Sequence, residues 1–368
     1  MKYDYLQART RRAAVRSMTR RALLQRSGAL LGLATVPGFL AACGGGGNKA
    51  PATQNTVAQA TQSQSAAAPT VAAPTVAAPT VVAPTAAAPT AAAAAASAAI
   101  PSGPLTVKAS EANGYPIFSI DKLAVAAGPL AVNFVVAGNM KHELWVYPLQ
   151  DVSTLMNKKR AGESASEPDY LKQLVAQTGE VDVGLTKAVQ GTVTPGFYEL
   201  SCFIKGANPD GTSYRHFDVG QALTVAVVGT GGPSASVLTP GNTITVDMVP
   251  GTEALKDSWL FIPDRLTAKA GDVTFKANNK MDVAHDLVVY PLGNISQFIT
   301  SRFAGQEDYT MIKGQQVFED LDAGKSGEKV AKLTPGWWAA ACFMVGKNPD
   351  GTSFLHRDKG QRFTFLVQ

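Results

Sequence analysis

The chain of 368 residues is poor in the side chains that most often bind transition metals or transfer protons. It contains only four histidines and three cysteines. Any site that needs imidazole must therefore draw on the same four residues. The small number of histidines limits the possible chemistry more than any other feature of the composition.

Long apolar runs are also absent, and the apolar stretch over residues 29–42 is too short to span a bilayer as a helix. It follows the twin-arginine pair Arg20-Arg21 and ends in Leu40-Ala-Ala-Cys43-Gly, which resembles the bacterial lipoprotein box. In such a box the cysteine sulfur receives a diacylglyceryl group, so we expect lipidation at Cys43. Residues 1–43 are predicted to be an export signal that leaves the protein extracytoplasmic, in the periplasm or on the outer face, and lipid-anchored to the cell membrane. The alternative is an uncleaved anchor.

Basic charge is scarce once this signal is set aside. Residues 1–43 carry eight Lys/Arg and one acid, whereas the formal net charge of the whole chain is +5, so the remainder is at −2. Nucleic-acid binding requires a basic surface. We therefore expect no nucleic-acid partner.

Residues 44–103 contain no acidic and no aromatic residue, and consist largely of Gly, Ala, Pro, Thr, Ser and Gln. Five prolines recur at regular intervals from Pro69 to Pro89. A segment of this composition cannot bury a core. We expect a disordered tether whose ends are on average roughly 40 Å apart.

The rest of the chain carries one pattern twice. His142 is followed by Cys202, His216 and Gln221, and His285 is followed by Cys342, His356 and Gln361. Both copies read Cys-x13-His-x4-Gln, and together they contain all four histidines. From Asp121 and Asp264 up to the first histidine the copies align without a gap, and a short deletion in the second copy shifts the alignment after it. A duplication explains this best, and predicts two domains, 104–229 and 230–368.

Short apolar segments separated by Gly, Pro, Asn and Asp predict β-strands in both domains. They cover residues 130–136, 143–147, 197–203 and 223–228 in the first domain, and 273–277, 286–290, 337–344 and 363–367 in the second. The spacing predicts an all-β fold of two tandem Greek-key β-sandwiches. The charged segments 153–177 and 296–320 are expected to form short helices on the sandwich flanks, with helical character over 169–176.

Two imidazoles, one thiolate and a weak oxygen donor in each domain form the ligand set of a blue-copper site. The residues alone leave other interpretations open. His216 and His356 could be surface residues on a lengthened loop, and Gln221 and Gln361 could simply cap the last strand. Each cysteine could be a free structural residue. A disulfide between Cys202 and Cys342 is disfavoured, because both lie in apolar strands of separate domains.

On these residues the chain resembles a tandem cupredoxin, of the group that contains plastocyanin, azurin and the auracyanins. The resemblance covers about 104–228 and 243–368. It rests on His142 with the strand after it, on Tyr198-Glu-Leu-Ser-Cys202, on His216-Phe-Asp-Val-Gly-Gln221, and on their counterparts in the second domain. It implies up to one type 1 copper ion per domain.

The chain departs from the family pattern in two ways. Gln221 and Gln361 stand where most members have an axial methionine, which resembles stellacyanin-type sites and implies a lower potential. The loop between cysteine and second histidine has thirteen residues, where family members have only a few. It contains Asn-Pro-Asp-Gly in both copies, a strong turn signal, so we expect a small hairpin that returns the chain to the site.

Enzyme chemistry is disfavoured by the histidine count. Two-domain copper nitrite reductases and laccase-like oxidases need further histidines beyond the four already placed. A binuclear purple-copper centre needs two cysteines in one short loop. A Ser-His-Asp arrangement would have to take a histidine from one of the two sites. We therefore expect no enzymatic activity.

The resemblance implies transfer of single electrons between membrane redox complexes or small redox proteins that dock transiently. The alternatives are a lipoprotein that binds or delivers copper without redox turnover, and a metal-free binding module. In the family the loop histidine reaches the surface, so we expect His216 and His356 to be electron ports beside an apolar docking face that includes Tyr214, Phe217 and Phe354. Glu143 and Asp286, which follow the first histidines, are expected to be solvated and to have no role.

Overall fold

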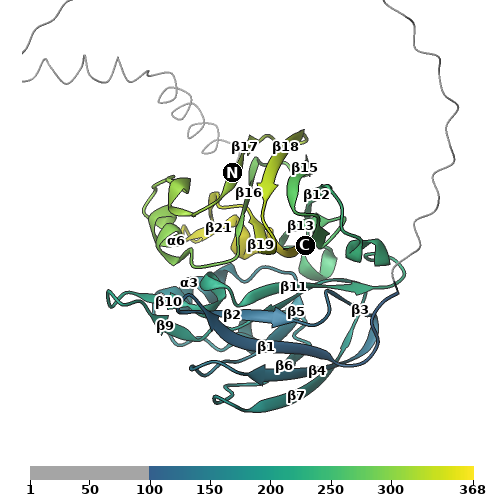
Figure 1. The fold of residues 1–368 in the computed structure, drawn as a ribbon. Coiled ribbons are helices and arrows are strands. Elements are labelled where there is room, and N and C mark those ends of the chain that lie inside the picture. Colours follow the sequence, from purple (N-terminus) through teal and green to yellow (C-terminus); the bar gives the residue numbers. More distant parts are fainter. Residues whose placement is uncertain (1–98) are drawn as a thin grey trace, which may run out of the picture. The chain divides into compact units, whose positions relative to one another are not determined.

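The computed structural model describes residues 99–368 (Figure 1). The predicted export signal, the lipidation site Cys43 and the predicted tether up to residue 98 lie outside the described residues. Among the described residues, no helix is both long enough and apolar enough to cross a membrane. We refer to residues 104–229 as the first half and to 230–368 as the second half, at boundaries that stay a prediction.

The first half is a β-sandwich of two sheets (Figure 1). One sheet has the strand order β2 (Tyr115–Ile120), β1 (Leu105–Ala112), β4 (Gly128–Val136) and β7 (Thr186–Val193). The other has the order β3 (Ala124–Ala126), β11 (Ala222–Val228), β8 (Gly196–Ser201), β5 (Trp145–Pro148) and β6 (Ala176–Gln177). Each predicted strand of this half has a counterpart here, so the all-β prediction is confirmed.

The second half has the same strand order. Its first sheet contains β13 (Trp259–Pro263), β12 (Thr243–Pro250), β15 (Gly271–Asn279) and β18 (Ser326–Leu333). Its second sheet contains β14 (Thr267–Ala268), β22 (Arg362–Val367), β19 (Gly336–Ala341), β16 (His285–Pro291) and β17 (Gln316–Leu321). Two one-turn 3-10 helices, η1 (Ala235–Leu238) and η2 (Glu253–Leu255), lie in its connections.

The alternation of side chains along the strands produces the two cores. In β4, Leu130, Val132, Phe134 and Val136 are buried, and the residues between them are partly exposed. They pack against the inner face of the other sheet, which contributes residues such as Leu200. Full burial of one such large apolar side chain is worth about 1.5–3 kcal/mol. Period-two patterning therefore decides which face of each strand points inward.

The segment that follows β5 in the first half, and the one that follows β16 in the second, cover the outer flank of each second sheet. In the first half this segment contains helices α3 (Ser153–Arg160) and α4 (Glu167–Tyr170), and in the second α6 (Ser296–Phe303) and the 3-10 helix η3 (Tyr309–Met311). Leu155 and Met156 of α3 pack in one buried cluster with Trp145 and Phe203. The sheet is consequently buried on both faces, and the predicted flank helices are confirmed.

The helical character expected over 169–176 is wrong beyond Tyr170, where α4 ends. The chain then becomes extended, and Val175 N–H donates to the Val146 carbonyl at 2.9 Å. Residues Ala176–Gln177 form β6 on the edge of β5. Pairing with an exposed sheet edge satisfies these backbone groups and outweighs local helix propensity.

The halves contact each other through corresponding residues. Thr224 N–H donates to Thr364 Oγ1 at 2.7 Å, and Thr364 N–H donates to Thr224 Oγ1 at 3.0 Å. Val152 N–H, just before α3, donates to the Asp358 carbonyl at 2.7 Å. In the same way Ile295 N–H, just before α6, donates to the Asp218 carbonyl at 3.3 Å. Asp218 and Asp358 each lie two residues after the second histidine of their half. Their carbonyls thus anchor this part of the chain to the start of the flank helix of the other half.

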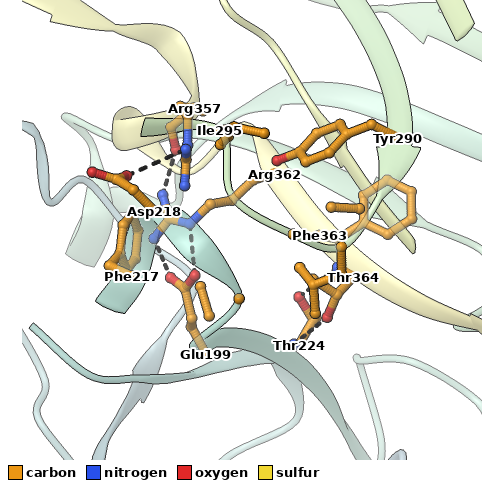
Figure 2. Close-up of a pocket in the computed structure, with 15 residues that line it drawn as sticks. Glu199, Phe217, Asp218, Thr224, Tyr290, Ile295, Arg357, Arg362, Phe363 and Thr364 are labelled. Carbon is orange, nitrogen blue, oxygen red and sulfur yellow. Dashed lines mark hydrogen bonds and ion pairs between the residues drawn. The ribbon is translucent and has the colours of Figure 1, made fainter. Parts of the chain in front are cut away.

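Charged side chains, most of them buried, reinforce this contact, and we call them the interface ion-pair cluster. Figure 2 shows four of them, Glu199, Asp218, Arg357 and Arg362. Arg362 of the second half pairs with Glu199 of the first, and both are almost fully buried. Arg160 pairs with Asp218 at 2.9 Å and with Asp358 at 2.5 Å. Arg357 lies 3.4 Å from Asp218 and completes the cluster. Every carboxylate in the cluster has a guanidinium partner, which offsets the cost of burying these charges.

Candidate metal centres

The first centre lies where four segments of the first half meet. Cys202 directly follows β8, His216 begins the short helix α5 (His216–Val219), and Gln221 directly precedes β11. Cys202 Sγ lies 3.4 Å from His216 Nδ1. Gln221 Oε1 lies 3.0 Å from His142 Nδ1 and 3.1 Å from His216 Nδ1. Donor atoms of His142, Cys202 and His216 all fall within 4.8 Å of one another, and all four side chains are buried.

The second centre has the same plan. His285 begins β16, Cys342 follows β19, His356 begins the 3-10 helix η4 (His356–Lys359), and Gln361 precedes β22. Cys342 Sγ lies 3.9 Å from His285 Nδ1 and 3.4 Å from His356 Nδ1. The two Nδ1 atoms are 3.1 Å apart. The structure therefore brings together each set of residues that the pattern singled out.

Backbone hydrogen bonds hold the cysteine and loop histidine in place. Cys202 N–H donates to the Gln221 carbonyl at 3.1 Å, and Gln221 N–H donates to the His216 carbonyl at 3.0 Å. The corresponding bonds in the second centre are 3.0 and 3.3 Å long. These bonds fix the donors before any metal binds, which favours a site of defined geometry.

The long loop between cysteine and second histidine is a hairpin in each half, as predicted. In the first half β9 (Lys205–Ala207) pairs with β10 (Ser213–Arg215), and in the second β20 (Val345–Lys347) pairs with β21 (Ser353–Leu355). The turn is closed by the asparagine of Asn-Pro-Asp-Gly, whose N–H donates to the carbonyl of the threonine that follows this motif. Because its two strands are antiparallel, the hairpin brings the chain back toward the cysteine. The long loop therefore still places the second histidine at the centre.

Burial sets the protonation of the donors. It lowers the pKa of His216 to about 3 and that of His285 to about 4, and it also lowers the pKa values of His142 and His356. The four imidazoles are therefore neutral at pH 7, with a lone pair available for a metal. Burial, together with a neighbouring carboxylate, raises the pKa of both cysteine thiols. The thiol must lose its proton when a cation binds, so metal uptake releases protons.

Glu143 and Asp286 are buried, so the expectation that they are solvated is wrong. Glu143 accepts a hydrogen bond from Phe203 N–H at 3.0 Å, and Asp286 accepts one from Phe343 N–H at 2.8 Å and another from Tyr309. The flank segment covers the outer face of the sheet, toward which these side chains point. Each carboxylate thus holds the residue after the cysteine, a positioning role that the alternation pattern alone could not reveal.

The apolar docking face expected beside the loop histidines is also wrong. His216 and His356 are at most 4% exposed, and Tyr214, Phe217 and Phe354 are at most 5% exposed. Phe217 lies under the guanidinium groups of Arg357 and Arg362 from the other half. The other half thus covers Phe217, whereas Tyr214 packs against Tyr115 and Phe354 against Trp259 of their own halves.

Both centres suit a metal ion on the chemistry of their donors. Each combines one thiol and two neutral imidazoles around one point, and Gln361 Oε1 of the second centre is buried without a hydrogen-bond partner. A buried polar atom without a partner is costly unless a ligand satisfies it. Sulfur with imidazole nitrogen selects copper or zinc over the hard cations. Cys202 and Cys342 are free, which excludes a disulfide between them.

Comparison with known proteins gives structural likenesses only. No family model and no curated protein matches the chain. A dithionite-reduced auracyanin from Roseiflexus castenholzii is 16% identical and covers 35% of this chain and 98% of its own, with a TM-score of 0.24. Auracyanin A from Chloroflexus aurantiacus, described as a "blue" copper protein, is 19% identical and covers 34% and 100%, with a TM-score of 0.25. A multicopper oxidase is 12% identical and covers 72% and 88%, also at 0.25. At these values the likenesses carry no conclusion about function.

Proposed function

We propose that the protein transfers single electrons through two type 1 copper centres, one in each half. The observation that carries this proposal is the convergence, twice in one chain, of a buried cysteine sulfur with two neutral imidazole nitrogens. His142, Cys202 and His216 would hold the ion in the first half, and His285, Cys342 and His356 in the second. Gln221 and Gln361 would supply the weak fourth donor.

Copper bound to one thiolate and two imidazoles alternates between two oxidation states with little change in geometry. The protein contributes a rigid and dry donor set. The backbone bonds between cysteine, loop histidine and glutamine would hold the donors in place around a bound ion. Burial keeps bulk water away from the donors, so a substrate would have no access to a bound ion. This arrangement favours a carrier over an enzyme, and it uses all four histidines.

The export signal and the lipid on Cys43 would place the carrier outside the cytoplasm on a flexible tether. Its partners would then be membrane redox complexes or small redox proteins, which it would meet transiently. Since the loop histidines are covered, we place electron entry and exit elsewhere on the surface than at Tyr214, Phe217 and Phe354.

The test is copper loading of the full chain, with visible absorption and metal quantitation. We expect an intense thiolate-to-Cu(II) band and two copper ions per chain. Cys202→Ser and Cys342→Ser should each remove one ion and about half of the band. Cys43→Ser is the matched control, because it also removes a cysteine and should leave the spectrum unchanged.

Copper binding without the band would overturn electron transfer and favour a copper-binding lipoprotein without redox turnover. No binding at all would favour a metal-free binding module.

A further inference from the structure

The two centres have the same donors but different surroundings, and the strand register identifies the difference. Leu105 of β1 pairs with Val132, and Ile244 of β12 pairs with Phe275. Val132 aligns with Phe275 in the same ungapped register that aligns His142 with His285. Leu105 and Ile244 are therefore equivalent, and the same step along each strand makes Glu111 equivalent to Pro250.

Glu111 places a carboxylate beside the first centre. Its Oε1 lies 3.6 Å from His142 Nε2, on the side of the ring opposite to the donor nitrogen Nδ1. Both carboxylate oxygens accept from Asn139 N–H, at 2.9 and 3.0 Å, and the side chain is only 15% exposed. At 3.6 Å, Glu111 Oε1 and His142 Nε2 lie beyond hydrogen-bond distance, and His142 Nε2 is buried without a hydrogen-bond partner. The carboxylate therefore acts on His142 through its negative charge, which makes the imidazole a stronger donor.

The second centre has no such carboxylate, because Pro250 occupies the equivalent position. Like His142 Nε2, His285 Nε2 is buried without a hydrogen-bond partner, so the two centres differ here in the nearby carboxylate and not in hydrogen bonding. Trp259 fills this side instead, with its ring centroid 5.7 Å from that of His285 and 4.7 Å from that of His356. By the pairing of each first strand with its neighbour, Trp259 is equivalent to Pro116 of the first half.

The glutamines also differ in orientation. Gln221 Oε1 faces both imidazoles, and its amide donates to the Ile117 carbonyl at 3.2 Å. In the second centre the Gln361 amide instead contacts Met281 Sδ at 3.5 Å. Met281 is equivalent to Gly138 in the register that aligns the first histidines, so the first centre has no thioether there.

The oxidised ion carries one more positive charge than the reduced ion, so a nearby carboxylate favours oxidation. Each centre has a buried carboxylate beside its cysteine, Glu143 or Asp286, and Glu111 adds a second carboxylate to the first centre alone. Resting on the proposed function, we propose that the two centres are inequivalent and that the second has the higher reduction potential. Glu111 is the positioning residue that lowers the potential of the first centre, through His142. Electrons taken up by the molecule then reside mainly in the second half.

The experiment measures midpoint potentials by spectroelectrochemistry on the copper-loaded full chain. Cys342→Ser isolates the first centre, and Cys202→Ser isolates the second. We expect the second centre to have the higher potential. Adding Glu111→Gln to Cys342→Ser should lower the oxidised-to-reduced ratio of the first centre about tenfold at a given ambient potential. This corresponds to a midpoint potential that is higher by about 59 mV for one electron. Glutamine retains an oxygen that can accept from Asn139, so the fold is preserved.

Two controls separate a specific effect of Glu111 on the reduction potential of the first centre from a general loss of charge or stability. Glu163→Gln removes an exposed carboxylate of the same half, which pairs with Lys158, and should leave the potential unchanged. Glu111→Gln combined with Cys202→Ser should leave the midpoint potential of the second centre unchanged. Equal potentials, a reversed order, or no response of the first centre to Glu111→Gln would overturn the inference while the visible band persists. Absence of the band would instead contradict the proposed function.

Discussion

At the scale of single residues, the spacing of His, Cys and Gln predicted which side chains come together, and the structure brings them together in both halves. Their role as metal ligands stays a prediction. Glu111, Glu143 and Asp286 could not be assigned from the sequence. A carboxylate on a strand is ordinary in composition, and only the fold shows what covers it or what it faces.

The buried histidines make the metal-free protein sensitive to acid. The pKa of His285 is about 4 in the folded state, against an ordinary value of 6.5. Between these values the unfolded chain binds a proton that the folded chain does not, so the free energy of unfolding falls as pH decreases below 6.5. Above 6.5 this contribution is absent. We expect a loss of about 2 kcal/mol from His285 between pH 7 and pH 5.

Urea unfolding of the metal-free chain at the two pH values measures this loss. The variant His285→Gln lacks the titrating group, so its free energy of unfolding should fall by about 2 kcal/mol less over the same interval. An identical fall in the variant and the unsubstituted chain would contradict the assignment.

At the scale of elements, the strands and the two hairpins followed from alternation and from the Asn-Pro-Asp-Gly turns. The helix expected over 169–176 did not form past Tyr170, because a sheet edge was available to the chain. Local propensity predicts an element reliably only when no tertiary partner competes for its backbone groups.

The hairpin of the second half depends on close contact between a glycine and an aromatic ring. A Cβ on Gly346 would lie 2.4 Å from the Phe354 ring, which stacks on His356 with centroids 5.9 Å apart. Gly346→Ala should therefore displace Phe354, lower the free energy of unfolding by about 1–3 kcal/mol and weaken metal binding at the second centre. Chemical denaturation and copper titration measure the two effects.

Gly293→Ala is the matched control in the same half. A Cβ there has its nearest neighbour at 3.9 Å, and the backbone is not left-handed. Stability and copper binding should stay unchanged within about 0.5 kcal/mol. If Gly346→Ala left stability and copper binding as unchanged as this control, the position of the Phe354 ring would not depend on the absence of a side chain at Gly346.

Across the whole molecule, the interface between the halves covers Phe217, the residue after the loop histidine of the first centre. It is built from corresponding residues, such as Thr224 with Thr364, and from the interface ion-pair cluster. The sequence contains these charges, but nothing in their spacing indicates that residues so far apart in the chain pair with each other.

Removing one partner of the cluster should be costly. Glu199→Gln leaves the Arg362 guanidinium buried without its counter-charge, and we expect a loss of about 3–5 kcal/mol in the free energy of unfolding. Asp257→Asn is the control, since it breaks an ion pair with Lys172 that also joins the halves but is more than half exposed on both sides. It should cost about 0–1 kcal/mol. Urea denaturation measures both, and similar losses would contradict a structural role for the buried pair.

The repeating donor pattern, the β-strands and the turns could be predicted from the sequence, because these depend on residue type and on short-range periodicity. The folded structure was needed to show that the flank segments bury Glu143 and Asp286, that Glu111 faces His142, and that the two halves pair through buried charges. These features depend on which distant surfaces pack together. Such packing is set by the summed burial of many side chains and by paired charges, and no single motif records it.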